Sequence, residues 1–240
     1  MVGKSQIKLI RSLHQKKYRN QNGLFIVEGI KGVKEVLASP IKPYGIFSVD
    51  PGIFEKTNID FTLITEADLR QMSTLKNPNV VLGVFHVPEA SQVDFNDWIL
   101  VLDDVRDPGN LGTIIRLCDW FGIPHLVCSK QTVDCYNPKV LQATMGSISR
   151  VNIVYTDIAA FLKVCPLPTY GAFMNESSVY SEELPEAGIL IMGNEANGIS
   201  SEIEKKVYRK ISIPQYGKKT TESLNVATAT GILLNEVRRD

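Results

Sequence analysis

Short runs of consecutive apolar residues recur through the second half of the chain. They begin at residues 98, 125, 150, 170, 188 and 210, in the segments WILVLDDV, HLVCSK, RVNIVYT, YGAFM, GILIMGNE and KISIPQ. Strands of a parallel sheet that is buried on both faces have this unbroken apolar character. Helical patterns fill the intervals, at 110–121, 137–148, 157–165, 200–208 and 221–238. We therefore predict an α/β domain over 98–240, in which helices cover both faces of an open parallel sheet.

The first 90 residues contain smaller elements. Apolar residues at helical spacing predict one helix over 4–20 with a basic outer face, then a strand at 23–29 and a helix at 30–39. A strand at 44–49, a helix at 65–73 capped by Thr65 and a strand at 79–87 complete a small α/β unit. The polar segment 88–97, PEASQVDFND, is typical of a linker between two domains, 1–90 and 98–240.

The composition indicates an ordinary globular protein, with 44% hydrophobic and 22% charged residues. No segment reaches the ~18 consecutive apolar residues of a membrane span, and the N-terminus lacks the apolar core of a secretory signal. We therefore expect a cytoplasmic protein. The four cysteines show no CxxC spacing and the three histidines no HxxxH spacing. Neither a disulfide framework nor a metal site is expected.

Net charge is zero, but basic residues gather near the N-terminus. Residues 1–42 hold nine Lys or Arg against two Glu, so this segment carries +7 and the remainder must carry −7. Lys16, Lys17 and Arg19 surround Tyr18 in HQKKYRNQ, and a cluster of this kind suits the phosphate backbone of RNA. The alternative is a solvated helix face.

Polar residues concentrate where three of the buried strands end, which is where ligands bind in open α/β sheets. The first of these loops, DDVRDPGNLGTIIR, joins a strand to a helix. Asn110 is suited to cap that helix, and Arg116 lies on its polar face one turn after Gly112. Two interpretations of these polar residues stay open. They belong either to an ordinary turn between strand and helix or to a binding site.

The second loop, GILIMGNEANGIS, places Gly193 and Glu195 directly after a buried strand. Gly193 would let a ligand lie against the backbone, and Glu195 needs a basic partner such as Arg116. In the third loop, Ser223 and Asn225 precede the last helix, either as its caps or as site residues.

These loops together carry a family resemblance. The segments DPGNLGTIIRLCDWFG, LIMGNEANGIS and ISIP...SLNVATATGILLNE resemble, in this order, the three motifs of the SpoU (TrmH-type) RNA methyltransferases. The resemblance covers 98–240 and implies a trefoil-knotted SPOUT domain that works as a homodimer. It also implies S-adenosylmethionine-dependent methylation of a ribose 2′-hydroxyl in RNA. The first 90 residues resemble the family's L30e-like substrate-binding domain.

The resemblance also assigns site residues. Five lie at the family's conserved polar positions, namely Asn110, Arg116, Glu195, Ser223 and Asn225. Gly193, Ile213 and Leu224 match positions that hold the cofactor, and the segment around Asn175 belongs to the same site.

By similarity, Arg116 lies beside the target 2′-hydroxyl. Because a guanidinium has a pKa above ~12, we expect Arg116 to stabilise the forming alkoxide rather than to take its proton. Glu195 would orient Arg116, and the remaining polar residues would form a net around them. Ala196, Gln215 and the Asn175 segment depart from the family's usual residues, which leaves cofactor affinity and RNA choice open.

Two other function classes fit the sequence less well. A nucleotide-dependent oxidoreductase needs GxGxxG, whereas DPGNLGTIIR offers only GxxG. An inactive RNA-binding ribosome-assembly factor would not need an intact set of polar site residues. Family members with an appended basic domain often act on the ribosome, so we favour ribosomal RNA over tRNA as the substrate.

Overall fold

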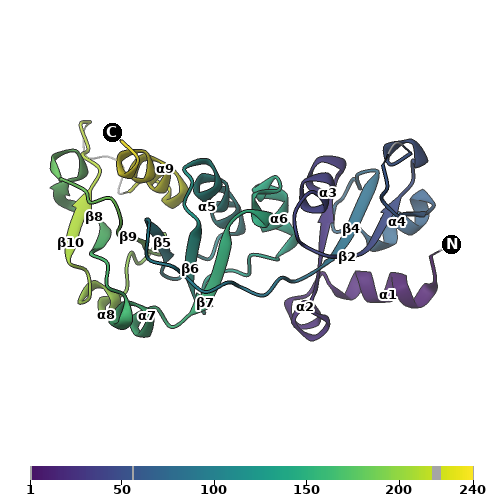
Figure 1. Ribbon diagram of the computed structural model, residues 1–240, viewed down its shortest axis with the longest axis horizontal. Helices are drawn as coiled ribbons and strands as arrows, with labels where there is room; N and C mark the ends of the chain where they lie inside the picture. The colour runs from purple at the N-terminus through teal and green to yellow at the C-terminus, as the bar shows by residue number, and fades with distance from the viewer. Residues whose placement is uncertain (1, 56, 218–222, 240) are drawn as a thin grey trace. The chain divides into compact units, whose positions relative to one another are not determined.

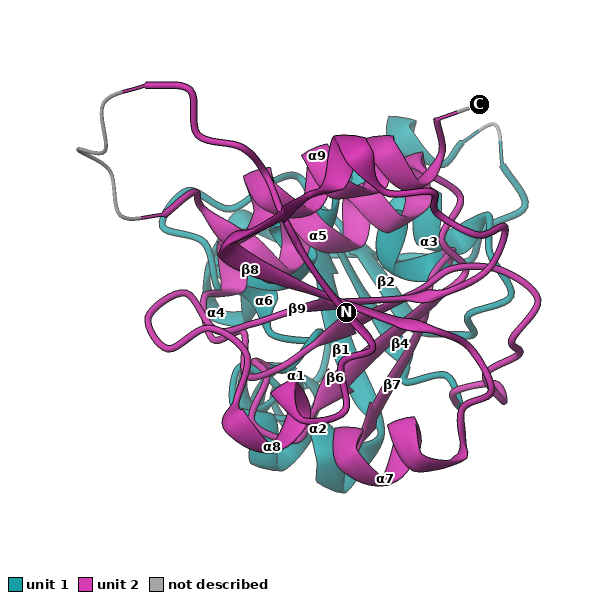
Figure 2. Cartoon of the chain, turned by 90° about the vertical axis from the view of Figure 1, so that its left-hand side faces the viewer, with its two compact units in different colours: residues 1–89, 134–149 teal, residues 90–133, 150–240 magenta. Residues whose placement is uncertain are grey.

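The computed structural model describes residues 2–55, 57–217 and 223–239, which form two compact units (Figure 1, Figure 2). Unit 1 comprises Met1–Glu89 and Asp134–Ser149, and unit 2 comprises Ala90–Val133 and Arg150–Asp240. The predicted linker spans the division between Glu89 and Ala90. The segment Asp134–Ser149, which the predicted second domain included, instead folds with unit 1. It does so because its helix α6 (Pro138–Thr144) packs against strand β1 (Leu24–Glu28). Tyr136, just before α6, contacts Phe25 with the ring centroids 4.7 Å apart.

Unit 1 is built on a sheet of strand order β1-β4-β2-β3. Strand β4 runs antiparallel to β1 and β2, and β3 runs parallel to β2. The predicted cap is confirmed, since Thr65 forms a capping box with Asp68. Besides β1 and α6, the elements are α1 (Lys4–Ser12), α2 (Lys16–Asn22), α3 (Ile30–Leu37), β2 (Pro43–Ser48), η1 (Pro51–Ile53), β3 (Thr62–Leu63), α4 (Glu66–Met72), β4 (Val81–His86) and η2 (Ser147–Ser149).

The helix predicted over 4–20 is in fact two helices, because the chain turns at residues 13–15. Gln15 has an extended backbone and begins α2, while the His14 ring bonds the carbonyl of Met72 at 2.8 Å. The break leaves helix-end carbonyls without partners, and Arg19 Nη1 donates to those of Leu13 and His14 at 2.9 and 3.0 Å. Apolar spacing could not reveal this break, since the arginine that satisfies it lies in the next helix.

Unit 2 confirms the predicted α/β fold. Its strands pair in parallel in the order β10-β8-β9-β5-β6-β7, and helices cover both faces of the sheet, with α5 and α9 on one side and α7 and α8 on the other (Figure 1). The strands are β5 (Ile99–Leu102), β6 (His125–Ser129), β7 (Asn152–Thr156), β8 (Thr169–Ser178), β9 (Ile189–Met192) and β10 (Arg209–Ser212). The helices are α5 (Pro108–Trp120), α7 (Ile158–Val164), η3 (Val179–Ser181), α8 (Ser201–Glu204) and α9 (Val226–Val237).

The strand order changes direction beside β5. From β5 the chain adds β6 and β7 on one side, then crosses to build β8, β9 and β10 on the other, with β9 against β5. Loops that leave neighbouring strands in opposite directions open a crevice at the carboxyl ends of those strands. The segments after β5 and β9 meet at this point.

Helix α9 returns from the sheet edge to pack along α5. Gly231 lies where α9 faces α5, since a Cβ added there would lie 3.5 Å from the Leu117 side chain. The third loop falls partly on 218–222, outside the described residues. The trefoil knot stays a prediction.

Among the described residues, no helix is long and apolar enough to cross a membrane. The cysteines are free thiols, of which Cys118, Cys128 and Cys135 are buried. The described part of the chain contains no group of three or more His, Cys, Asp or Glu arranged to hold a metal ion.

Candidate functional site

The loops after β5 and β9 are fastened to each other by hydrogen bonds. The buried carboxylate of Asp103 accepts from the Ser200 backbone N–H at 2.8 Å, and Asn194 Nδ2 donates to the Asp104 carbonyl at 2.7 Å. Asp104 adopts the left-handed conformation, with φ of 62°. Sequence reasoning assigned no role to Asp103 or Asn194. The available signal was an acidic pair directly after an apolar strand, which is costly unless each group has a partner.

Gly193 is required by the loop's own backbone. A Cβ at this position would lie 2.2 Å from the carbonyl carbon of Gly198 and 2.3 Å from the Ile199 nitrogen. Asn194 and Gly198 are joined by two backbone hydrogen bonds of 2.9 Å, which close the loop tightly over Gly193. The loop's own backbone therefore fills the space that a side chain would occupy, which requires glycine here whether or not a ligand is bound.

Three predicted site residues form one chain of hydrogen bonds across α9, α5 and the β9–α8 loop. Asn225 Nδ2 donates to Asn110 Oδ1 at 2.9 Å, and Asn110 Nδ2 donates to Glu195 Oε1 at 2.9 Å. Asn225 is also the N-cap of α9, where its Oδ1 accepts from the backbone N–H groups of Ala227 and Thr228. The cap fixes which end of the Asn225 amide donates, and this in turn directs the Asn110 amide NH₂ at the Glu195 carboxylate.

The cap of α5 differs from the predicted one. Asp107 is the N-cap, accepting from the Asn110 N–H at 2.7 Å, and Pro108 follows at the first helical position. Because Asp107 satisfies the helix end, the Asn110 side chain is free to join the chain to Glu195.

Arg116 and Ser223 stand outside this chain of hydrogen bonds. Both are exposed, and neither makes a side-chain hydrogen bond or ion pair with a described residue, so the expected Arg116–Glu195 pair is not formed there. Seven of the nine arginines do form ion pairs. Within the described chain only Arg11 and Arg116 keep an unpaired guanidinium, which leaves each available to an anion.

A cavity of about 1270 Å³ opens beside Glu195. Its apolar wall comes from the ends of β9 and β10 and from α9, and includes Met192, Ile211 and Leu233. The predicted cofactor residues Gly193, Ile213, Leu224 and Asn175 all line this one cavity, together with Glu195 and Ser223.

Among the described residues, the charged side chains that line the cavity are all acidic, namely Glu176, Glu195 and Glu204. Lys210, just outside, bonds Glu204 at 2.5 Å and lies 3.9 Å from Glu176, so it offsets part of this charge. A cavity with an apolar wall and an acidic rim suits a ligand that carries an apolar body and positive charge.

The segment around Asn175 bulges from the sheet to form one wall of the cavity. Between Lys210 and Ile211 of β10, the register on β8 jumps from Gly171 to Ser177. Asn175 has φ of 59°, in the left-handed region that asparagine tolerates better than most residues. Asn175 therefore provides the left-handed backbone conformation found in this bulge.

The fold exposes part of the basic cluster of the N-terminal region and buries the rest. Lys16 and Lys17 are exposed on α2, as an RNA contact requires. Arg19, however, is 3% exposed and donates to Asp134 Oδ2 from Nε and Nη2, at 3.1 and 2.5 Å. The expectation that Arg19 contacts RNA is corrected, because its charge is used inside unit 1.

Comparison with known proteins assigns the chain to a family. Residues 97–235 match the SpoU rRNA Methylase family, and residues 4–83 match the MRM3-like substrate binding domain. The 23S rRNA (guanosine(2553)-2′-O)-methyltransferase RlmP of Bacillus subtilis is 32% identical over 97% of this chain and 96% of its own length.

Solved structures agree with this assignment. A TrmH-family protein from Porphyromonas gingivalis has a TM-score of 0.91 at 36% identity, covering 99% of this chain and 98% of its own. An AdoMet-bound rRNA methyltransferase from Sinorhizobium meliloti has a TM-score of 0.86 at 27% identity. The match covers 99% of this chain and 96% of that protein's chain. This chain belongs to the SpoU rRNA methylase family.

Proposed function

We propose that this protein transfers the methyl group of S-adenosylmethionine to the 2′-hydroxyl of a ribose in ribosomal RNA. Membership of the SpoU family confirms the expected class of enzyme, an RNA 2′-O-ribose methyltransferase, and its expected cofactor. The observation that carries the assignment of the site is the chain from Asn225 through Asn110 to Glu195 at the edge of the acidic cavity.

Ribosomal RNA is favoured over tRNA because of the relatives that span the whole chain. RlmP is aligned along nearly its full length, including the N-terminal domain. A structure described as concerned with methylation of C/U34 on tRNA covers only 59% of this chain, at a TM-score of 0.54. This tRNA-related structure therefore matches a smaller part of the chain than RlmP does.

The cavity fits S-adenosylmethionine in size, polarity and charge. Pockets for ligands of this size usually measure ~300–1,000 Å³, and the cavity of about 1270 Å³ is large enough. The backbone at Gly193, Ile213 and Leu224 would hold the adenosine portion, while the segment around Asn175 would close over the cofactor. The acidic rim suits the sulfonium and amino groups, and the bound cofactor supplies the methyl group as an electrophile.

The chain's own residues would supply position and charge stabilisation. In the reaction the ribose oxygen forms a bond to the methyl carbon as the sulfur–methyl bond breaks, and the hydroxyl proton leaves to water. Arg116, unpaired and exposed, would stabilise negative charge on that oxygen, because its guanidinium keeps its proton and cannot serve as the base. Glu195, fixed by Asn110, would hold the loop that borders the reacting groups.

We also propose a homodimer through the C-terminal domain, a trefoil knot in that domain and a cytoplasmic location. Support for the dimer comes from Trp120, which is 83% exposed on α5, the helix that also presents Arg116. Sedimentation should give a dimer for the wild type and a smaller species for Trp120→Glu.

The test uses methyl-labelled S-adenosylmethionine and the ribosomal RNA and tRNA pools of cells that lack this gene. A 2′-O-methyl group blocks alkaline cleavage of the adjacent phosphodiester, so we expect alkali-resistant label in ribosomal RNA. Arg116→Ala and Glu195→Ala should each abolish it. Cofactor binding without transfer to RNA or to assembling ribosomal subunits would instead support an inactive RNA-binding factor.

A further inference from the structure

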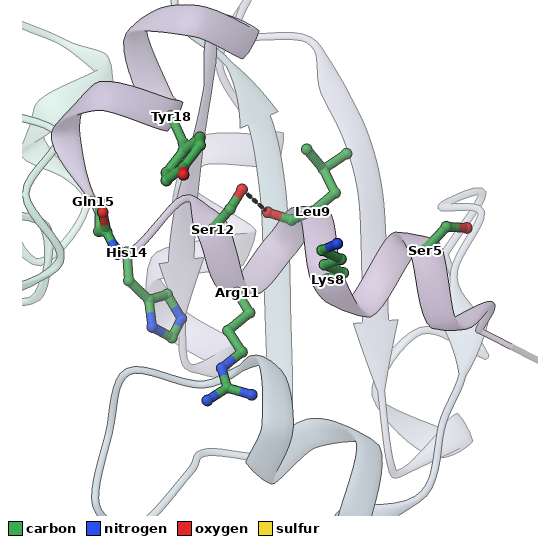
Figure 3. Close-up of a pocket in the computed structure, with 8 residues that line it drawn as sticks. All are labelled: Ser5, Lys8, Leu9, Arg11, Ser12, His14, Gln15 and Tyr18. Carbon is green, nitrogen blue, oxygen red and sulfur yellow. Dashed lines mark hydrogen bonds between the residues drawn. The ribbon is translucent and has the colours of Figure 1, made fainter.

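A shallow groove runs between α1 and α2, on the part of unit 1 where the chain breaks between the two helices (Figure 3). It has a volume of about 710 Å³ and is lined by Ser5, Lys8, Leu9, Arg11, Ser12, His14, Gln15 and Tyr18. None of these described lining residues is acidic. Its existence depends on the helix break at residues 13–15, because a continuous helix would present a convex surface there.

The cations around the groove have no carboxylate partners. No Asp or Glu occurs before Glu28, and Lys4, Lys8, Arg11, Lys16 and Lys17 are all exposed. Within the described residues none of these five forms an ion pair, whereas most arginines elsewhere in the chain do. Unpaired, clustered surface cations repel one another and are stabilised by a polyanion.

Tyr18 adds an aromatic surface to this charge. Its ring is partly exposed, lies on the α2 side of the groove, and has the Lys17 ammonium 5.9 Å from its centroid. Among the described residues the Tyr18 hydroxyl has no hydrogen-bond partner. A positively charged groove with an aromatic side chain is the combination that binds single-stranded nucleic acid, since each base can stack and each phosphate can be neutralised.

We propose that the α1–α2 groove binds an unpaired stretch of the RNA substrate, with a base stacked on Tyr18 and phosphates on Lys8 and Arg11. This rests on the proposed function, because the RNA held there is the substrate of the methyl transfer. The groove lies within unit 1 and uses none of the residues assigned to the cavity in unit 2.

The proposal is tested by direct binding of fluorescent RNA, with a single-stranded oligonucleotide and the corresponding duplex as probes. We expect the single strand to bind more tightly, and Lys8→Gln with Arg11→Gln to weaken it about tenfold or more. The slope of log K against log salt should become shallower by ~1.4, or ~0.7 for each lost phosphate contact. Lys42→Gln with Arg70→Gln removes the same charges from exposed positions outside the groove and should change binding little.

Substitutions of Tyr18 distinguish the contribution of base stacking to RNA binding from that of charge. Tyr18→Leu should weaken single-strand binding about fivefold or more, and Tyr18→Phe, which keeps the ring, should retain the wild-type affinity. Methyl transfer by the groove variants should show a raised KM for RNA with kcat and cofactor affinity unchanged.

The binding assay does not depend on methyl transfer, so the two proposals can fail separately. If the groove variants bind RNA with wild-type affinity, the groove proposal is overturned. The basic surface would then be assigned to an acidic protein partner instead. A Tyr18→Leu protein that binds like the wild type, or a duplex that binds as well as the single strand, would overturn the stacking role. Absence of methyl transfer alongside groove-dependent RNA binding would count against the proposed function alone.

Discussion

Asn225 Nδ2 lies 2.9 Å from Asn110 Oδ1, so the residue that begins the last helix also orients a side chain on α5, 115 positions earlier in the sequence. The same Asn225 side chain uses its oxygen to cap α9. Two roles that the sequence offered as alternatives, helix cap and site residue, are thus filled by the two ends of one amide. The chain of hydrogen bonds ends on Glu195, at the edge of the cavity.

This double role can be separated by substitution at Asn225. Asn225→Asp keeps an oxygen for the cap but removes the amide that donates to Asn110. Since Asp and Asn cap helices about equally well, the unfolding free energy should change by less than ~0.5 kcal/mol while methyl transfer falls at least tenfold. Asn225→Ala removes both contacts and should cost ~1 kcal/mol as well as activity. Urea unfolding and labelled-methyl transfer measure the two effects, and full activity in Asn225→Asp would show that the amide is not needed.

Gly193→Ala tests the packing of the loop after β9. The added Cβ would lie 2.2 Å from backbone that cannot move aside without opening the Asn194–Gly198 bridge. We expect a loss of ~3 kcal/mol in unfolding free energy and of cofactor binding by calorimetry. Gly217→Ala is the matched control, because no atom of the described residues lies within 4 Å of a Cβ placed there. Equal behaviour of the two variants would contradict the described loop.

Arg238 holds the end of α9 to the start of β5 and the end of α5. It bonds both oxygens of Asp97, at 2.7 and 2.9 Å, and the carbonyls of Phe121 and Gly122. Burial by itself would raise the pKa of Asp97, but hydrogen bonds from Arg238 and from the Trp98 N–H outweigh it and hold that pKa below its ordinary value. Arg238→Met should therefore lose ~2 kcal/mol near pH 7.

The pH dependence of that loss has a definite sign. A lowered carboxylate pKa contributes stability that is present above the unfolded pKa, ~4 for Asp, and is lost as the pH falls through the folded value. The difference in unfolding free energy between wild type and Arg238→Met should thus be constant at neutral pH and shrink below pH ~4. Denaturant titrations at a series of pH values measure it, and a difference that grew on acidification would refute the ion pair's contribution.

The acidic rim of the cavity should distinguish cofactor from product. S-adenosylmethionine carries one more positive charge than S-adenosylhomocysteine, so it should bind several-fold more tightly at low salt, and the preference should narrow as salt screens the charge. Glu176→Gln should also reduce the preference for S-adenosylmethionine over S-adenosylhomocysteine. Glu183→Gln changes an exposed residue outside the cavity and should leave that preference unchanged. Calorimetry with both ligands measures this, and a preference unaffected by salt and by Glu176→Gln would exclude an electrostatic origin.

Much of the fold of unit 2 was predictable because buried parallel strands leave an apolar signature that short-range patterns reveal. The order of those strands was not predictable, because no short sequence pattern indicates that β9 lies between β5 and β8. The break between α1 and α2 and the placement of Asp134–Ser149 in unit 1 both involve contacts that short-range patterns do not reveal. Arg19 bonds both the broken helix end and Asp134, a contact between residues 115 positions apart.

The site residues were predictable by type and resemblance, but their contacts were not. Glu195 was expected to pair with Arg116 and instead accepts from Asn110. Asn110 was expected to cap a helix, yet Asp107 does so, three residues earlier. In both cases two residues could make the same hydrogen bond, either to the Glu195 carboxylate or to the free N–H groups at the start of α5. Only the three-dimensional arrangement determines which residue makes it.

The most direct test of the account is the 2′-O-methylnucleoside content of ribosomal RNA in cells that lack this gene, measured by mass spectrometry. Deletion should remove one 2′-O-methylated nucleotide, which the wild-type gene restores and Arg116→Ala does not, although the variant protein accumulates and binds S-adenosylmethionine. Ribosomal RNA that keeps every 2′-O-methyl group after deletion, or full restoration by Arg116→Ala, would contradict it.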